Sequence, residues 1–134
     1  MEFKTGGAIS TPSRSFRTVI RDIFSAGVGP MVVRLSVAGY EQDWDRRPAF
    51  VGHHYAAMRV RVLVDGAVLP PGETTLIDNR GVVSVQAPRP LAAGYEWAGS
   101  ILTSGVKTVK VQVANLHAFD MANINHWTLA VQHN

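Results

Sequence analysis

The chain has 134 residues, of which 46% are hydrophobic and 17% charged, with no cysteine and a formal net charge of +3. This length suits one domain with its own core, and the absence of cysteine excludes a disulfide framework and thiolate chemistry. No apolar run approaches the ~18 residues of a membrane span. Residues 1–7 lack the apolar core of a secretory signal. The basic residues are scattered along the chain, which predicts a solvated surface rather than a nucleic-acid site.

The first quarter of the chain contains one ambiguous segment. Residues 1–14 are small and polar and predict an N-terminal arm, followed by one domain over residues 15–134. In residues 15–25 the apolar side chains fall at helical spacing, with no clean apolar face for a strand. The strand-like surroundings favour a strand, and a short helix is the alternative. Residues 31–37 alternate with period two and predict a strand.

The middle of the chain predicts short strands separated by turns. Tyr40–Gly52 is a long polar loop, and in Tyr55–Val64 the valines alternate with Arg59 and Arg61, which we expect to face outward. Asp65 and Gly66 predict a tight hairpin turn of the primed type, because both tolerate positive φ. The further predicted strands are Ala67–Leu69, Thr74–Asp78, Val82–Gln86 and Tyr95–Leu102.

The C-terminal part shows the most regular alternation. Lys107–Val113 and Asn125–Gln132 predict two strands joined by the connection Leu116–Ile124, and we expect the last strand to lie in the middle of a sheet. Trp97 and Trp127 fall on apolar faces and predict core packing. With about eight strands and no βαβ alternation, the chain predicts an all-β, single-domain antiparallel β-sandwich.

Catalytic and metal-binding patterns are weak. His53 and His54 are adjacent, so they point to opposite faces of an extended chain, whereas a catalytic zinc site needs three converging ligands. Asp43 and Asp45 precede two arginines, which predicts a salt-bridged loop rather than a calcium site. No serine lies in a Gly-x-Ser-x-Gly motif. We therefore expect no metal, no cofactor and no enzyme activity.

Two polar connections hold the candidate binding residues. Trp44 lies in a charged loop with Tyr40 at its base, and aromatic side chains beside arginines are typical of interface anchors. His117 and Asp120 share the second connection and can approach each other. The predicted partner-binding residues are Tyr40, Trp44, Arg46, Arg47, His117 and Asp120.

Several stretches together resemble a known type of module. They are residues 15–19, Gly29 to Arg34, Arg59 to Gly66, Gly105 to Val113 and Trp127 to Val131. This layout resembles the jelly-roll, tumour-necrosis-factor-like modules of tailed-phage virion proteins and some bacterial surface proteins. The resemblance covers roughly 100 residues and implies a jelly-roll-like sandwich that assembles as a homotrimer.

The sequence leads to one functional hypothesis and two alternatives. The first is a non-enzymatic virion structural protein, made in the host cytoplasm, that forms a capsid decoration, accessory or fibre module. Its expected partners are itself and a major capsid or tail protein, with no nucleic acid and no membrane. The alternatives are a lectin-like carbohydrate-binding module that uses Tyr40, Trp44 and Tyr95 on a surface glycan, and a small hydrolase.

Overall fold

All the regular secondary structure of the described residues is β-strand. A computed structural model describes residues 1–43, 57–78, 91–116 and 120–134, with the backbone alone at 40–43, 76–78, 91, 120 and 121. Within these ranges no helix is long and apolar enough to cross a membrane. The strands are β1 (Glu2–Gly6), β2 (Ile9–Thr11), β3 (Arg17–Ala26), β4 (Gly29–Asp43), β5 (Ala57–Val64), β6 (Ala67–Val68), β7 (Thr74–Asp78), β8 (Leu91–Ile101), β9 (Gly105–Asn115) and β10 (Asp120–Gln132).

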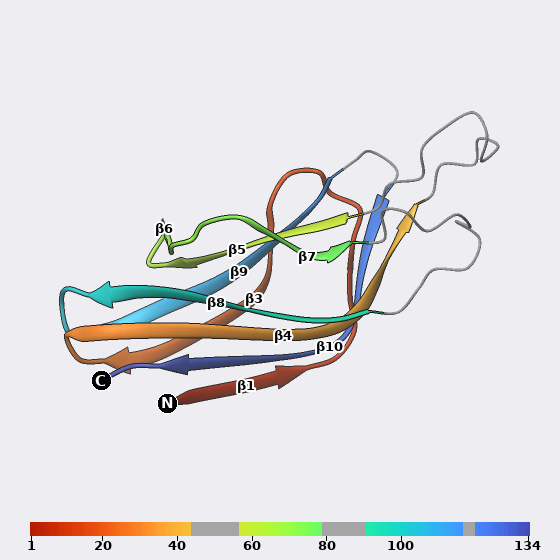
Figure 1. The fold of residues 1–134 in the computed structure, drawn as a ribbon. Helices are drawn as coiled ribbons and strands as arrows, with labels where there is room; N and C mark the ends of the chain where they lie inside the picture. Colours follow the sequence, from red (N-terminus) through yellow and green to blue (C-terminus); the bar gives the residue numbers. More distant parts are fainter. Residues whose placement is uncertain (44–56, 79–90, 117–119) are drawn as a thin grey trace.

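The strands form two antiparallel sheets that pack face to face (Figure 1). Sheet A has the order β1-β10-β4-β8, with β2 also on β10, and sheet B has the order β3-β9-β5-β6, with β7 also on β5. In sheet A, β4 pairs with one edge of β10, and the short strands β1 and β2 share the other edge. In sheet B, β9 pairs with one edge of β5, and the short strands β6 and β7 share the other edge. Each sheet therefore has four strand positions. The expected antiparallel, jelly-roll-like sandwich is confirmed.

The ambiguous segment of residues 15–25 is a strand, and the helical alternative is wrong. β3 pairs with β9 along nearly its whole length. The pairing register shifts between Thr18 and Ile20, so that one extra residue changes which side chains face inward. After the bulge the strand alternates regularly, with Ile20 and Phe24 buried and Ile23 exposed. The inward row also contains Asp22 and the outward row contains Ile23, so the sequence of this segment shows no clean apolar face.

Two predicted loops contain strand residues, and both predictions are corrected in part. β4 continues through Asp43, into the loop predicted to begin at Tyr40, and β10 begins at Asp120, inside the connection predicted to end at Ile124. The two extensions pair with each other, from Asp43 opposite Asp120 to Gly39 opposite Ile124. The two extensions therefore satisfy each other's backbone hydrogen-bonding groups. The polar side chains of these segments give no sign of this pairing in the sequence. The predicted strand Val82–Gln86 lies outside the described residues.

The core lies between the two sheets and follows the predicted alternation. β10 is a central strand of sheet A, as expected, with β1 and β2 on one side and β4 on the other. Trp97 is fully buried, and its indole Nε1–H donates a hydrogen bond of 2.8 Å to the carbonyl oxygen of Gly72. The other buried inward residues include Val60, Val62, Val109, Val111, Val113, Trp127, Leu129 and Val131.

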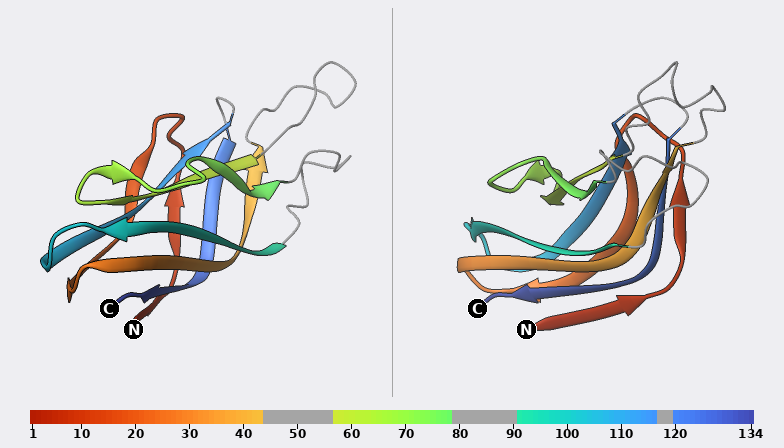
Figure 2. Two further views of the ribbon diagram at one scale, coloured as in Figure 1. Left: turned by 60° about the vertical axis from the view of Figure 1, so that its left-hand side comes forward. Right: turned by 45° about the vertical axis from the view of Figure 1, so that its right-hand side comes forward.

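Sheet A is strongly bent, and the bend sets where the strand ends lie. β4 and β10 curve together away from the plane of the sheet (Figure 2). A bulge in β10 between Ile124 and His126 lies beside Gly39 of β4. A bulge shifts the ladder and increases local twist, so the two strands turn as a pair. The strand ends at Asp43 and Asp120 therefore lie together at one end of the molecule (Figure 1).

Candidate functional site

The structure places only the backbone of two of the six predicted partner-binding residues. Tyr40 lies in β4 opposite Asn123, and Asp120 begins β10 opposite Asp43. The strand ends that lead into the two predicted binding segments are therefore neighbours. The other four residues, Trp44, Arg46, Arg47 and His117, lie outside the described residues. Their role in binding stays a prediction.

The described histidines and carboxylates do not gather into a metal centre. In the described ranges no group of three or more histidine, cysteine, aspartate or glutamate side chains is placed to hold a metal ion. His133 stacks on Phe24 with ring centroids 4.8 Å apart, and its Nε2 lies 3.6 Å from a carboxylate oxygen of Glu2. His126 is exposed on the outer face of sheet A. His133 is therefore held by ring stacking and by its contact with Glu2.

The outer face of sheet A, which we call the neutral face, is covered mainly by small side chains. Arg34 and Glu96 are opposite each other on β4 and β8 and form an ion pair, which balances the charge of this face. Phe3 on β1 adds an exposed aromatic ring. The other outward residues of the neutral face include Thr5, Pro30, Val32, Ser36, Ala38, Ala92, Gly94, Ala98, Ser100, His126, Thr128, Ala130 and Gln132.

Two shallow hollows lie next to each other on the neutral face. One has a volume of about 230 Å³ and lies between β4 and β10, and the other has about 310 Å³ and lies between β4 and β8. Both are lined by Ser36 of β4, so they adjoin each other across three strands, and we call the pair the transverse depression. Thr128 and Gly94 line its two halves. Hydroxyl, imidazole and ion-paired groups give this depression hydrogen-bonding capacity for a polar ligand.

The outer face of sheet B is basic, in contrast to the neutral face. Arg21 of β3 is opposite Lys110 of β9, and Arg59 and Arg61 project from β5 on the same face. We call these four residues the basic face. Arg61 donates from Nε to Gln112 Oε1 at 2.8 Å, and its guanidinium carbon lies 4.2 Å from the centre of the Phe16 ring. Stacking and hydrogen bonding therefore hold the Arg61 guanidinium in one place.

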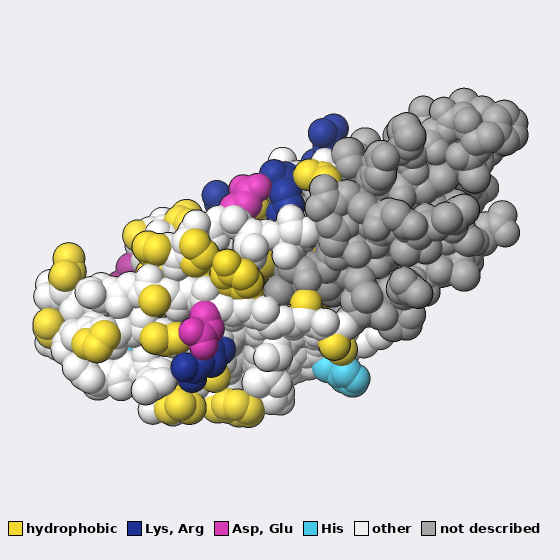
Figure 3. Space-filling view, viewed as in Figure 1, with side chains coloured by type: hydrophobic (Ala, Val, Ile, Leu, Met, Phe, Trp, Pro, Cys, Tyr) yellow, Lys and Arg dark blue, Asp and Glu magenta, His cyan; other side chains and the backbone are white. Residues whose placement is uncertain are grey.

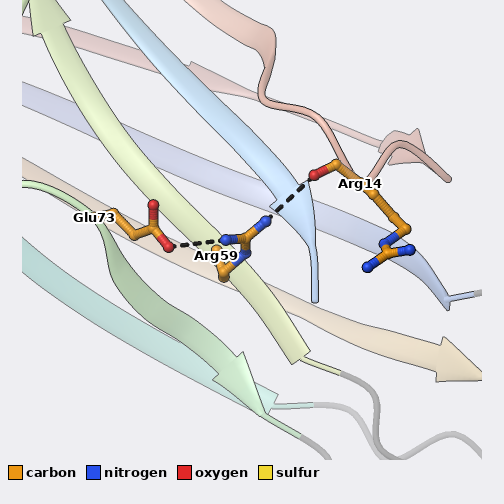
Figure 4. A network of polar contacts seen from close by, with 3 residues as sticks. All are labelled: Arg14, Arg59 and Glu73. Carbon is orange, nitrogen blue, oxygen red and sulfur yellow. Dashed lines mark hydrogen bonds and ion pairs between the residues drawn. The ribbon is translucent and has the colours of Figure 1, made fainter. Parts of the chain in front are cut away.

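Arg59 has a different role, because its charge is balanced and it ties three segments together. Its Nη1 forms an ion pair of 3.0 Å with Glu73, which precedes β7, and its Nη2 donates to the carbonyl oxygen of Arg14 at 3.3 Å. Figure 4 shows Arg59 on β5 between these two partners. Arg59 therefore has a structural role at one end of the basic face, and no described carboxylate pairs with Arg21, Arg61 or Lys110.

Sequence reasoning did not find the basic face, because its members come from three distant parts of the chain. Arg59 and Arg61 were expected to face outward, and the structure shows both on the outer side of β5. The neighbours Arg21 and Lys110 lie on β3 and β9, and only the pairing of these strands brings them together. The sequence feature that could have indicated this face is that basic residues occupy outward positions in the predicted strands.

Exposed hydrophobic side chains gather at the end of the sandwich away from the strand ends of Asp43 and Asp120. Val28 lies in the turn between β3 and β4, and Leu102 in the turn between β8 and β9. The pair Gly29 and Ile101 places these turns side by side. Figure 3 shows hydrophobic side chains over this part of the surface. Val28, Leu102 and the exposed Val106 make up what we call the apolar tip.

Comparison with known proteins identifies the fold. No family model and no curated protein matches the sequence. Among solved structures, the sugar-binding C-terminal domain of EclA has a TM-score of 0.50 and 10% identity over 93% of this chain and 76% of its own. The insecticidal delta-endotoxin Cry8Ea1 of Bacillus thuringiensis has a TM-score of 0.50 and 14% identity, over 94% of this chain and 20% of its own.

A viral structure shares the fold at the same level. A chain in the structure of infectious bursal disease virus, Gx strain, has a TM-score of 0.50 and 7% identity over 99% of this chain and 32% of its own. This chain therefore spans a third or less of the viral chain and of the endotoxin. At these identities the similarities establish a shared sandwich fold and nothing about shared function.

Proposed function

We propose that this protein is a non-enzymatic structural protein of a virion, made in the host cytoplasm, which decorates a capsid or forms an accessory or fibre part. The observation that carries the proposal is the neutral face, a broad sheet surface whose described side chains are small and carry one balanced ion pair. The fold that the chain shares with a chain of infectious bursal disease virus supports it. The resemblance to phage jelly-roll modules supports it as well.

The neutral face suits association with a second protein surface. Small side chains let another surface approach the sheet closely, and charged residues are depleted in the centres of interfaces while aromatic residues are enriched. Phe3 is 66% exposed and lies on this face. We infer a homotrimer, as the resemblance implies, with the neutral faces of the copies turned toward one another. A major capsid or tail protein is the second partner.

The substitution Ser36→Arg tests this assembly. It places a guanidinium at the centre of the neutral face, where an unpaired buried charge weakens association by roughly 3 kcal/mol, or about a hundredfold. We expect the wild-type chain to have the mass of an oligomer in solution, and Ser36→Arg that of a monomer. The matched control is Ser104→Arg in the exposed turn between β8 and β9, which leaves the oligomer intact. A monomeric wild-type chain contradicts the proposal.

Purified particles provide the test of the virion role. We expect the protein to co-purify with capsids and to be visible on them by electron microscopy. Ser36→Arg protein, which lacks the oligomer, is expected to be lost from the particles, whereas Ser104→Arg protein stays bound. A free protein that never accompanies particles rules out this role.

A glycan-binding function is the second candidate, and the transverse depression is the observation that favours it. Its hydroxyl, carboxylate and guanidinium groups can pair with sugar hydroxyls. The measurement is a glycan array. A signal lost in Ser36→Arg and kept in Ser104→Arg places the sugar in the depression, whereas a signal lost in Trp44→Ala places it at the predicted loop. Absence of any signal from the wild-type chain removes this candidate.

A further inference from the structure

The basic face carries positive charge that the described residues leave unbalanced. Arg59 has Glu73 as its partner, but in the described ranges no carboxylate lies at ion-pair distance from Arg21, Arg61 or Lys110. These three side chains come from adjacent strands, β3, β9 and β5. Neighbouring strands lie ~4.8 Å apart, so the three charges repel one another unless an anionic partner covers them.

The arrangement of the basic face is fixed before any partner arrives. Arg61 is held between the Phe16 ring and the side-chain oxygen of Gln112. Gln112 in turn donates to the hydroxyl oxygen of Thr18 on β3 at 3.2 Å, which connects all three strands across the face. A guanidinium that is already ordered loses less conformational freedom when it binds a carboxylate.

Aliphatic side chains continue the same face toward the apolar tip. Along the β3–β9 ladder the outward pairs are Arg21 with Lys110, then Ile23 with Thr108, then Ser25 with Val106. Ile23 is 55% exposed and Val106 is 68% exposed. Outward residues of a strand are ~7 Å apart, so the basic and aliphatic parts together extend over roughly 14 Å.

This combination distinguishes between classes of anionic partner. Proteins that bind single-stranded nucleic acid without sequence preference combine basic residues with aromatic rings that are free to stack on bases. The Phe16 ring is already stacked on by the Arg61 guanidinium, with the Arg59 guanidinium carbon 5.4 Å from its centre. Exposed aliphatic side chains have no counterpart in a phosphate backbone, whereas a protein surface offers carboxylates and apolar groups side by side.

We propose that the outer face of sheet B is a docking site for an acidic protein surface, with carboxylates on Arg21, Arg61 and Lys110 and aliphatic side chains on Ile23 and Val106. This site goes beyond the assembly through the neutral face, because it lies on the opposite side of the sandwich. One molecule therefore engages its own copies through sheet A and an acidic protein through sheet B.

A labelled peptide tests the site on the full-length protein. The probe has a run of glutamates followed by leucines, and fluorescence anisotropy reports its binding. We expect saturable binding that weakens as salt rises toward ~0.15 M, because salt screens exposed charges. Lys110→Gln is expected to weaken binding by about two- to fivefold, and Arg21→Gln with Lys110→Gln by about tenfold. The matched control Lys107→Gln, on the same strand but paired with Asp65, leaves the affinity unchanged.

Two comparison probes decide the class of partner. A peptide with serines in place of the leucines is expected to bind more weakly than the first, and Val106→Ser is expected to reduce that difference, because Ile23 remains exposed. A thymidine oligonucleotide of equal charge is expected to bind more weakly than the leucine peptide. Equal affinity for the two peptides, tighter binding of the oligonucleotide, or equal losses in Lys107→Gln and Lys110→Gln overturn the proposal.

The peptide-binding test and the oligomer test can succeed or fail independently of each other. Peptide binding is measured on Ser36→Arg protein as well as on wild-type protein, and we expect the same affinity. A monomeric wild-type chain that binds the peptide contradicts the homotrimer and leaves the docking site in place. An oligomer that does not bind the peptide contradicts the docking site alone.

Discussion

A single glycine allows the two longest strands of sheet A to bend together. Gly39 lies in β4 beside the bulge of β10, and a Cβ at this position would collide with the backbone carbonyl oxygen of Asn123. Backbone atoms in a paired strand cannot rotate away as a flexible side chain can. Gly39 is therefore required by the close approach of the two strands and not by its own backbone angles.

We predict that Gly39→Ala lowers the free energy of unfolding by about 2–3 kcal/mol, because the strands must move apart to admit the methyl group. Gly94→Ala on β8 is the matched control, since its Cβ would meet its nearest neighbours at 3.5 and 3.6 Å, which is ordinary contact. We expect it to change stability by less than about 1 kcal/mol. Urea unfolding followed by tryptophan fluorescence measures both values, and equal effects would contradict the role of the bulge.

Among the elements, the β5–β6 hairpin depends on its turn and on a neighbouring strand. Asp65 has φ of 48° and Gly66 has φ of 85°, which confirms the predicted primed turn. The turn is also bonded to β9, because the N–H of Asp65 donates to the carbonyl oxygen of Thr108 and the N–H of Thr108 donates to Asp65 Oδ1, both at 2.9 Å. One aspartate thus sets the turn and attaches the hairpin to the sheet.

We predict that Asp65→Ala destabilises the protein by about 1–2 kcal/mol, because alanine disfavours positive φ and removes the acceptor for the N–H of Thr108. Asp65→Asn should cost less than about 1 kcal/mol, because asparagine tolerates positive φ and keeps an oxygen at the same place. The ion pair of Asp65 with the largely buried Lys107 is lost in both variants, so it does not affect the difference between them. Denaturant unfolding tests the order, and equal losses in the two variants would contradict it.

At the scale of the whole molecule, β1 covers the side where the edge of sheet A lies next to the edge strand β3 of sheet B. It pairs with β10 from Glu2 opposite Val131 to Gly6 opposite Trp127. The backbone of Gly6 lies directly against the Trp127 ring. Lys4 donates from Nζ to the carbonyl oxygen of Arg21 at 2.8 Å, which connects the edge of sheet A to the edge strand of sheet B. β1 therefore protects both a strand edge and part of the core.

We predict that deletion of residues 2–6 lowers the free energy of unfolding by roughly 2–3 kcal/mol and produces larger aggregates than the full chain forms. The deletion exposes Trp127 and leaves the edge of β10 unpaired, and such edges associate with other strands. The control Val28→Ala, which removes an exposed side chain from the turn between β3 and β4 and leaves β1 in place, should cost less than about 0.5 kcal/mol. Light scattering and urea unfolding are the measurements. Unchanged stability and mass after the deletion would show that β1 is dispensable.

The sequence by itself determined the features that depend on neighbouring residues along the chain. Alternation over residues 31–37 and 107–113 predicted strands with correctly assigned inward faces, because successive side chains of a strand point to opposite sides. The Asp65–Gly66 turn was predictable for the same reason, since its conformation depends on two residues alone. Trp97 and Trp127 were correctly assigned to the core by their place in that alternation.

The tertiary structure alone decided the features that need a distant partner. β3 is a strand because β9 pairs with it around a bulge, and the extensions of β4 and β10 exist because each satisfies the backbone of the other. The same pairing gathers Arg21, Arg61 and Lys110 on one face and small side chains on the other, which no single stretch of sequence shows. Hydrogen bonds between strands join residues far apart in the chain, so local pattern identifies strands but not their neighbours.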